Sequence, residues 1–269
     1  MNDSSNAEFS MLLWLLGLGV ATLAAHLSQA WVRVAQGRAN GVLRQWRAVL
    51  LAAAVLGTGL CSAVVLAMCA EALPFPIGYH YGPAAGLWLA AMVACVPVVA
   101  VAVATQRAWV LLGAGLVLAL VAGAVQGGWI LAAGFRPGVL WRREWVALAM
   151  VVLVVGLCAA LWVAHSETAQ SSPRRSLWRG SGAVLIGMTL MAGQSVLMFA
   201  GGVHHQRGSV YQQELPGTVL CLVCGVLLTL VMAAMSLDLL LRRQQRNQRN
   251  PKDFSPHKRR KRKHRSRQL

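Results

Sequence analysis

Seven long apolar stretches run through the sequence and limit what the chain can fold into. They lie near residues 11–31, 47–69, 85–105, 109–133, 145–164, 181–203 and 216–241. The hydrocarbon core of a bilayer is about 30 Å thick, and an α-helix needs roughly 20 apolar residues to cross it. Charged residues make up only 12% of the chain, against about 25% in soluble domains. The pattern predicts an all-α membrane protein with seven transmembrane helices.

Lys and Arg are distributed unevenly between these stretches. Eight lie in the connections after the first, third and fifth stretches and thirteen lie after the seventh, whereas only four lie in the other connections. Positive residues concentrate in cytoplasmic loops. The first ten residues contain Asp3 and Glu8 but no Lys or Arg, whereas a signal peptide begins with a positive region. We therefore expect a multi-pass protein of the cell membrane with its N-terminus outside and its C-terminus in the cytoplasm.

The chain is organised as one leading helix followed by three two-helix repeats, each opening with a glycine-containing helix that runs outward. We expect a short extracytoplasmic N-terminus at 1–10, a seven-helix membrane domain at 11–243 and a basic cytoplasmic tail at 244–269. The tail has little apolar content and much charge, so it is expected to be disordered.

A dense basic cluster lies near the end of this tail. Its members are Lys258, Arg259, Arg260, Lys261, Arg262, Lys263, Arg265 and Arg267. Such clusters beside a cytoplasmic helix end attract anionic lipid headgroups with about 1 kcal/mol per residue. We expect the tail to bind membrane lipids. The alternative is that the tail binds nucleic acid or an acidic protein, although no nucleic acid is expected as a partner. Nuclear localisation is disfavoured for a chain with seven membrane spans.

Several motif residues of the first repeat resemble those of a known family. The repeat reads GTGLCSAVVLAM and then CAEALPFPIGYH, with Gly57, Gly59, Ser62, Met68, Leu73, Pro74, Pro76, Gly78 and Tyr79 in the matching positions. Gly128 fits the same frame in the second repeat, and Gly187 and Met198 fit it in the third. In these residues, over positions 11 to about 243, the chain resembles the MHYT sensor domain, a seven-helix membrane module with three such units.

The chain departs from this family at the residues that carry its chemistry. The motif histidines correspond to Val64, Val125 and Gln194, and the aromatic positions to Val65, Gln126 and Ser195. In the family, the histidines and methionines are proposed to bind copper and through it to sense oxygen, carbon monoxide or nitric oxide. Valine has no lone pair to offer a metal. The resemblance therefore implies a degenerate copy whose copper and gas site is altered or lost.

Soft donor side chains nevertheless remain near the outer helix ends. They are Met68, Cys69, Met198, Cys221 and Cys224, and thioether and thiolate sulfurs suit Cu(I). His204 and His205 follow the sixth stretch. One hypothesis is a shallow outer copper site built from these residues. The alternative is that Met and Cys only fill gaps between helices, and no disulfide framework is evident, since all six cysteines fall in apolar stretches.

No arrangement typical of an enzyme appears in the sequence, which has no HExxH, no GxSxG and no phosphate-binding glycine loop. We expect a non-enzymatic integral membrane sensor or signalling module that resembles MHYT proteins. The alternative is a structural or assembly protein whose helices pair with another membrane protein or with a second copy. Transport is disfavoured, because no chain of buried carboxylates and no inverted repeat can be recognised.

Overall fold

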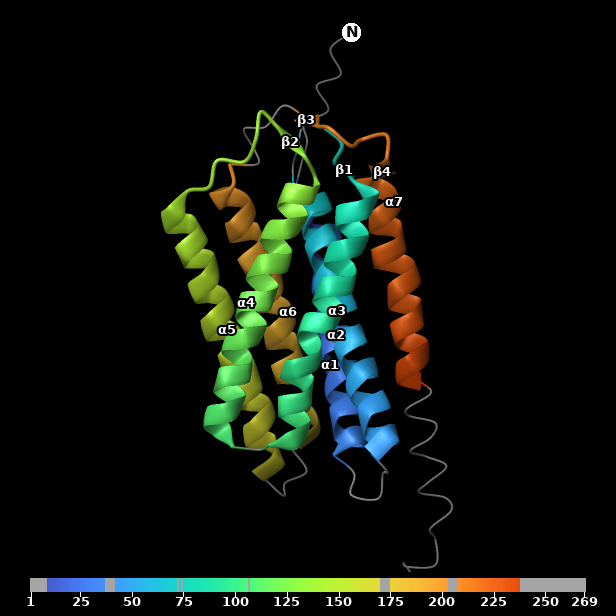
Figure 1. Ribbon diagram of the computed structural model, residues 1–269, viewed down its shortest axis with the longest axis vertical. Helices are drawn as coiled ribbons and strands as arrows, with labels where there is room; N and C mark the ends of the chain where they lie inside the picture. The colour runs from blue at the N-terminus through green and yellow to red at the C-terminus, as the bar shows by residue number, and fades with distance from the viewer. Residues whose placement is uncertain are drawn as a thin grey trace, which may run out of the picture. The chain divides into compact units, whose positions relative to one another are not determined.

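The computed structural model describes residues 9–36, 42–71, 73, 75–105, 107–169, 175–202 and 208–237. The helices are α1 (Met11–Ala35), α2 (Val42–Ala70), α3 (Tyr81–Ala104), α4 (Ala108–Ala132), α5 (Arg143–Ala169), α6 (Arg175–Ala200) and α7 (Gly217–Leu222). A π-helical turn, η2 (Val223–Leu227), continues α7, and the helix extends to Leu237. Among the described residues, seven helices are long and apolar enough to cross a membrane. The predicted fold class is confirmed (Figure 1).

The chain divides into two compact units, Met1–Met232 and Ala233–Leu269. The first unit holds the helix bundle. The second contains the end of the last helix, and the predicted lipid-binding tail from Lys258 to Arg267 lies outside the described residues.

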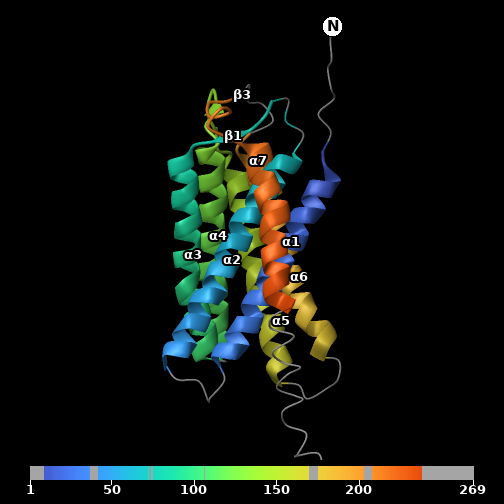
Figure 2. The same ribbon diagram turned by 90° about the vertical axis from the view of Figure 1, so that its right-hand side faces the viewer.

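The helices after α1 follow the order of the three predicted two-helix units. α2 packs on α3 and α4 packs on α5, whereas α7 packs on α2 rather than on α6. The connections from α2 to α3, from α4 to α5 and from α6 to α7 all lie at one end of the bundle (Figures 1 and 2). The N-terminus of α1 lies at the same end, because the Ser10 amide donates a hydrogen bond to the Ala70 carbonyl at the end of α2. The Ser10 hydroxyl also caps α1 by accepting from the Leu13 amide.

Several helices extend beyond the predicted apolar stretches. α2 begins at Val42 rather than near residue 47, and α5 continues to Ala169 rather than ending near 164. Hydropathy identifies only the part of a helix that lies in the hydrocarbon core of the bilayer. Backbone hydrogen bonding continues the helix beyond this part into the polar interface. Arg44 and Arg47 in the first turns of α2 are accordingly exposed.

α2 is the central helix of the bundle. Of its apolar span, 78% is buried by other helices, against 22% for α3 and for α5. The close approach of α2 to α3 and to α1 depends on two motif glycines. A Cβ atom at Gly57 would lie 2.7 Å from the Met92 backbone nitrogen, and one at Gly59 would overlap Ala24 Cβ. Small residues allow this type of helix contact within membranes.

Short strands join the α2–α3 and α4–α5 connections to the α6–α7 connection. The apolar pattern did not predict these strands. β1 (Gly78–Tyr79) pairs with β4 (Leu215–Pro216), and β2 (Phe135–Arg136) pairs with β3 (Gly208–Ser209), both antiparallel. We use the word cap for the described residues of these connections, 71–80, 133–142 and 208–216. Gly134 ends α4 at a φ of +57°, a conformation that favours glycine, and its carbonyl accepts from the Val210 amide.

Candidate functional site

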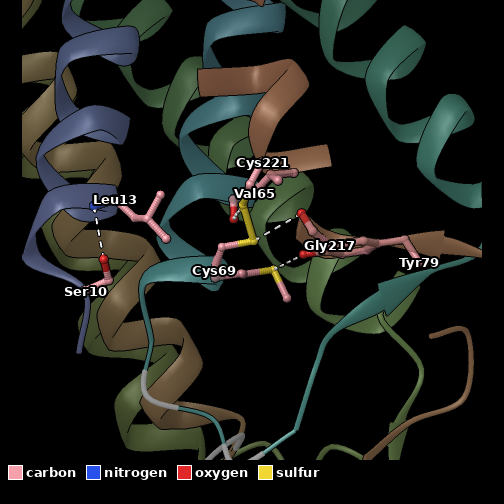
Figure 3. Close-up of a disulfide and its surroundings, with 8 residues drawn as sticks. Ser10, Leu13, Val65, Cys69, Tyr79, Gly217 and Cys221 are labelled. Atoms are coloured by element: carbon pink, nitrogen blue, oxygen red, sulfur yellow. Dashed lines mark hydrogen bonds between the residues drawn. A yellow bond between two sulfur atoms is a disulfide. The ribbon is translucent and has the colours of Figure 1, made fainter. Parts of the chain in front are cut away.

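A disulfide between Cys69 and Cys221 joins two helices directly below the cap. Cys69 is the next-to-last residue of α2 and Cys221 lies in the first turns of α7, 152 residues further along the chain. Figure 3 shows both side chains at the point where the two helices meet. The end of α2 and the beginning of α7 are therefore covalently connected.

The sulfur atoms of this disulfide lie near backbone carbonyl groups. Cys69 Sγ is 3.6 Å from the Gly217 oxygen, and Cys221 Sγ is 3.9 Å from the Val65 oxygen. A disulfide sulfur carries no proton, so these approaches are van der Waals contacts in the oxidised form. A thiol is a weak donor, so each cysteine would have an acceptor within reach once reduced.

Met68 and Tyr79 form a buried polar contact beside the disulfide. The Tyr79 hydroxyl lies 3.6 Å from Met68 Sδ, and both side chains are fully buried. The Tyr79 ring packs edge-on against Trp129 of α4, with ring centroids 5.2 Å apart. Burial raises the pKa of the Tyr79 phenol well above its ordinary value. Tyr79 therefore stays a neutral donor to the methionine sulfur at physiological pH.

One serine connects all three cap segments. The Ser209 hydroxyl accepts from the Gly78 amide at 3.1 Å and donates to the Ala133 carbonyl at 2.6 Å. Ser209 itself belongs to β3, whereas Gly78 belongs to β1 and Ala133 follows α4. On the cap surface, His80 Nδ1 lies 3.2 Å from Glu214 Oε2. The cap thus has its own polar contacts in addition to the disulfide below it.

Two fully buried glutamines form a second polar feature inside the bundle. Gln126 of α4 donates from Nε2 to the Leu190 carbonyl of α6 at 2.9 Å. Gln126 Oε1 and both amide atoms of Gln194 have no hydrogen-bond partner among the described residues. Leaving a buried polar atom unpaired costs about 1–3 kcal/mol, so apolar packing alone does not explain these side chains. Their unpaired amide atoms keep the capacity to donate or accept a hydrogen bond.

The disulfide changes the predicted soft-metal set. Met68, Met198 and Cys224 are fully buried, and Cys224 is a free thiol. Cys221, however, is bonded to Cys69 and has no thiolate to offer a metal in this form. The apolar positions of the cysteines did not indicate this bond, and Cys69 and Cys221 are not the unpaired gap-filling side chains of the alternative reading. Within the described residues no group of three or more His, Cys, Asp or Glu side chains could hold a metal ion, and His204 and His205 lie outside them.

The positions that correspond to the family histidines also do not fit copper. Val64 and Val125 are buried and apolar, and Gln194 offers an amide in place of an imidazole. Comparisons with protein-family models, with curated proteins and with solved structures found no match for this chain. The resemblance to MHYT sensor domains therefore remains an inference from the motif residues.

Proposed function

We propose that the chain is a non-enzymatic integral membrane sensor whose input is the thiol–disulfide state of Cys69 and Cys221. The observation that carries the proposal is the covalent connection between the end of α2 and the start of α7. α2 is the most buried of the membrane-spanning helices, and α7 begins the helix that leads in sequence into the basic tail. A change at this bond therefore acts on the central helix and on the helix that precedes the tail.

Two observations support an orientation with the cap outside the cytoplasm. More of the described arginines lie at the helix ends opposite the cap than at the cap, and positive residues favour the cytoplasmic side. The first group is Arg33, Arg44, Arg47, Arg107, Arg175 and Arg179, and the second is Arg136, Arg142 and Arg143. Disulfides form and persist in extracytoplasmic, oxidising compartments, and the cap end carries the disulfide. Charge and thiol chemistry thus support the proposed orientation by separate principles.

The input reaction is thiol–disulfide exchange between the Cys69–Cys221 bond and a dithiol. A dithiol reductant gives two electrons and two protons to the disulfide and becomes a disulfide itself, while the S–S bond breaks to leave two thiols. The Cys69 thiol then reaches the Gly217 carbonyl, and the Cys221 thiol reaches the Val65 carbonyl. The π-helical turn η2 begins two residues after Cys221, and such turns occur frequently at functional sites.

The alternative function is a structural or assembly protein in which the disulfide only stabilises the cap. The same bond supports this reading, since disulfides generally stabilise folded chains. The two functions differ in what reduction changes. A sensor transmits the change along α7, whereas a structural disulfide affects only the residues around it.

Hydrogen–deuterium exchange separates the two functions. The full chain is placed in lipid nanodiscs, and exchange is measured with and without a dithiol, for wild type and for the Cys69→Ser/Cys221→Ser variant. Cys61→Ser is the control, because Cys61 is a buried free thiol of the same helix. The sensor predicts that reduction raises exchange in residues 223–237 of wild type and leaves the double variant unchanged. A change confined to 71–80 and 208–216 would support the structural function instead.

A further inference from the structure

A groove of about 460 Å³ lies between α4 and α5 at the cap end of the bundle. Gly123 and Gly127 line it from α4, and Val146 and Met150 line it from α5. Leu197 of α6 also lines it and is itself buried. The groove wall is almost entirely apolar. The same two helices expose Leu131 and Leu148 to the surroundings of the bundle.

Glycines create this groove. A Cβ atom at Gly123 would lie 2.6 Å from Met150 Sδ, so a side chain there would press into the opposite wall. A Cβ atom at Gly127 would meet nothing within 4 Å. Interiors are normally close-packed, and at Gly127 the volume that a side chain would fill is left open.

The groove changes character along the bundle axis. Trp141 and Arg143 line it at the start of α5, and the apolar residues follow as far as Met150. At 1.5 Å per residue, Arg143 and Met150 are separated by roughly 10 Å along the helix. Trp and Arg are typical of the level of lipid headgroups. The groove thus has a cationic end at Arg143, called its mouth below, and an apolar end at Met150.

The local charges favour an anion at the mouth. Arg142 and Arg143 are exposed, and Glu144 is the acidic residue in the first turn of α5. These residues leave a net positive charge, to which the N-terminal end of the α5 dipole adds. The Arg142 amide donates to the Ala200 carbonyl at 2.9 Å and holds this segment against the end of α6. Arg143 is therefore carried on a positioned backbone.

We propose that this groove binds one anionic phospholipid, with an acyl chain between α4 and α5 and the phosphate beside Arg143. The separation of charge and apolar surface along the axis matches that of a phospholipid. A helix from a partner protein would present an apolar face along its length and would leave the Arg143 guanidinium without a counter-charge. This inference depends on membrane insertion and is independent of the thiol chemistry of Cys69 and Cys221.

Native mass spectrometry of the detergent-purified chain tests the site. The probes are palmitoyl-oleoyl phosphatidylglycerol, which is anionic, and the phosphatidylcholine with the same acyl chains. Gly127→Leu fills the groove. Its matched control is Gly113→Leu, the same substitution in α4 at an exposed glycine that also has open space and lies outside the groove. Arg143→Gln removes the cation, and Arg136→Gln, at another exposed arginine of the cap, is its control.

The proposal predicts one retained phosphatidylglycerol per wild-type chain. Gly127→Leu weakens this binding at least about tenfold, and Gly113→Leu leaves it unchanged. Arg143→Gln abolishes the preference for phosphatidylglycerol over phosphatidylcholine, and Arg136→Gln retains it. If Gly127→Leu fails to fold, the two arginine variants decide the question. Equal retention of both lipids by every variant would overturn the site, as would a dimer that forms in wild type and is lost in Gly127→Leu.

Discussion

Tyr79 combines complete burial with a contact to a methionine sulfur and therefore links the stability of the cap to pH. Burial raises its folded-state pKa, whereas the pKa of tyrosine in the unfolded chain is about 10. Above pH 10 the unfolded chain loses the phenolic proton while the folded chain retains it, so the free energy of unfolding decreases as pH rises.

We predict that wild type loses stability above about pH 10 more steeply than Tyr79→Phe, by up to about 1.4 kcal/mol per pH unit. Thermal unfolding in detergent, measured from about pH 8 to about pH 11, gives the difference. Tyr81→Phe is the control, since Tyr81 is exposed, and it should follow wild type. A Tyr79→Phe curve parallel to wild type would show that the phenol does not resist ionisation.

We expect copper binding near Met68 to depend on whether the neighbouring disulfide is reduced. In the oxidised chain Cys221 is bonded to Cys69, so we expect copper at no more than background in elemental analysis. Reduction makes two thiols available beside Met68, and thiol and thioether donors suit Cu(I). We expect copper to rise toward one per chain after reduction with added Cu(I).

The Met68→Ala/Met198→Ala variant should lose this copper. Met188→Ala is the control, because Met188 is exposed on α6. Copper that remains after both Met68 and Met198 are replaced would place the metal elsewhere. Stoichiometric copper in the oxidised wild type would show that the metal needs no free thiol from Cys69 or Cys221.

At the residue scale, the sequence indicated that sulfur-containing side chains lie near the outer helix ends, but it did not indicate the bond between Cys69 and Cys221. Helical spacing places Cys221 on the same face as Cys224, since residues three apart share a helix face. The bonded partner of Cys221 is Cys69, which only the packing of α7 against α2 brings near. Gln126 and Gln194 appeared in the sequence as departures from a motif, and the structure identifies them as buried amides.

At the element scale, the contact between α2 and α3 depends on Gly57. Alanine there would place Cβ 2.6 Å from Met92 Cα, and backbone atoms cannot rotate away. We predict that Gly57→Ala lowers the free energy of unfolding by about 2 kcal/mol through overpacking. Gly86→Ala in α3, where the added Cβ meets nothing within 4 Å, should be neutral or slightly stabilising. Equal melting temperatures for the two variants would contradict this contact.

The helices could be predicted because bilayer thickness sets their length. The four strands could not, since each is only two residues long and has no alternating pattern of its own. Backbone pairing between segments far apart in the sequence creates them. The Ser209 contacts to Gly78 and Ala133 could not be predicted for the same reason, because they also join segments far apart in the sequence.

At the scale of the bundle, hydropathy did not indicate which helix is central. The mean hydropathy of the spans is 2.4 for both α2 and α4 and 2.8 for α5, yet 78% of the α2 span is buried against 39% and 22%. Lipid and protein interior are both apolar, so hydrophobicity cannot separate a helix that faces lipid from one that faces other helices.

The disulfide should contribute to the stability of the bundle because it closes a span of 152 residues. Engineered and native disulfides typically contribute about 2–4 kcal/mol, and the helices of an unfolded membrane chain remain inserted, which favours the lower value. We predict that Cys69→Ser/Cys221→Ser lowers Tm by roughly 5 °C under oxidising conditions. Cys61→Ser/Cys95→Ser, at two buried free thiols, separates loss of the bond from loss of buried sulfur. A double cysteine variant as stable as wild type would contradict a stabilising bond.

The central claim is that the cap lies outside the cytoplasm and that Cys69 and Cys221 form a disulfide directly below it. Thiol trapping in intact cells tests this claim most directly. Cells are treated with a reductant that does not cross membranes and quenched, the chain is unfolded, and free thiols are alkylated for mass spectrometry. We predict that Cys69 and Cys221 are unmodified in untreated cells and become modified after treatment, while Cys158 is modified in both. Modification of Cys69 and Cys221 without reductant, or only after the cells are permeabilised, would contradict the claim.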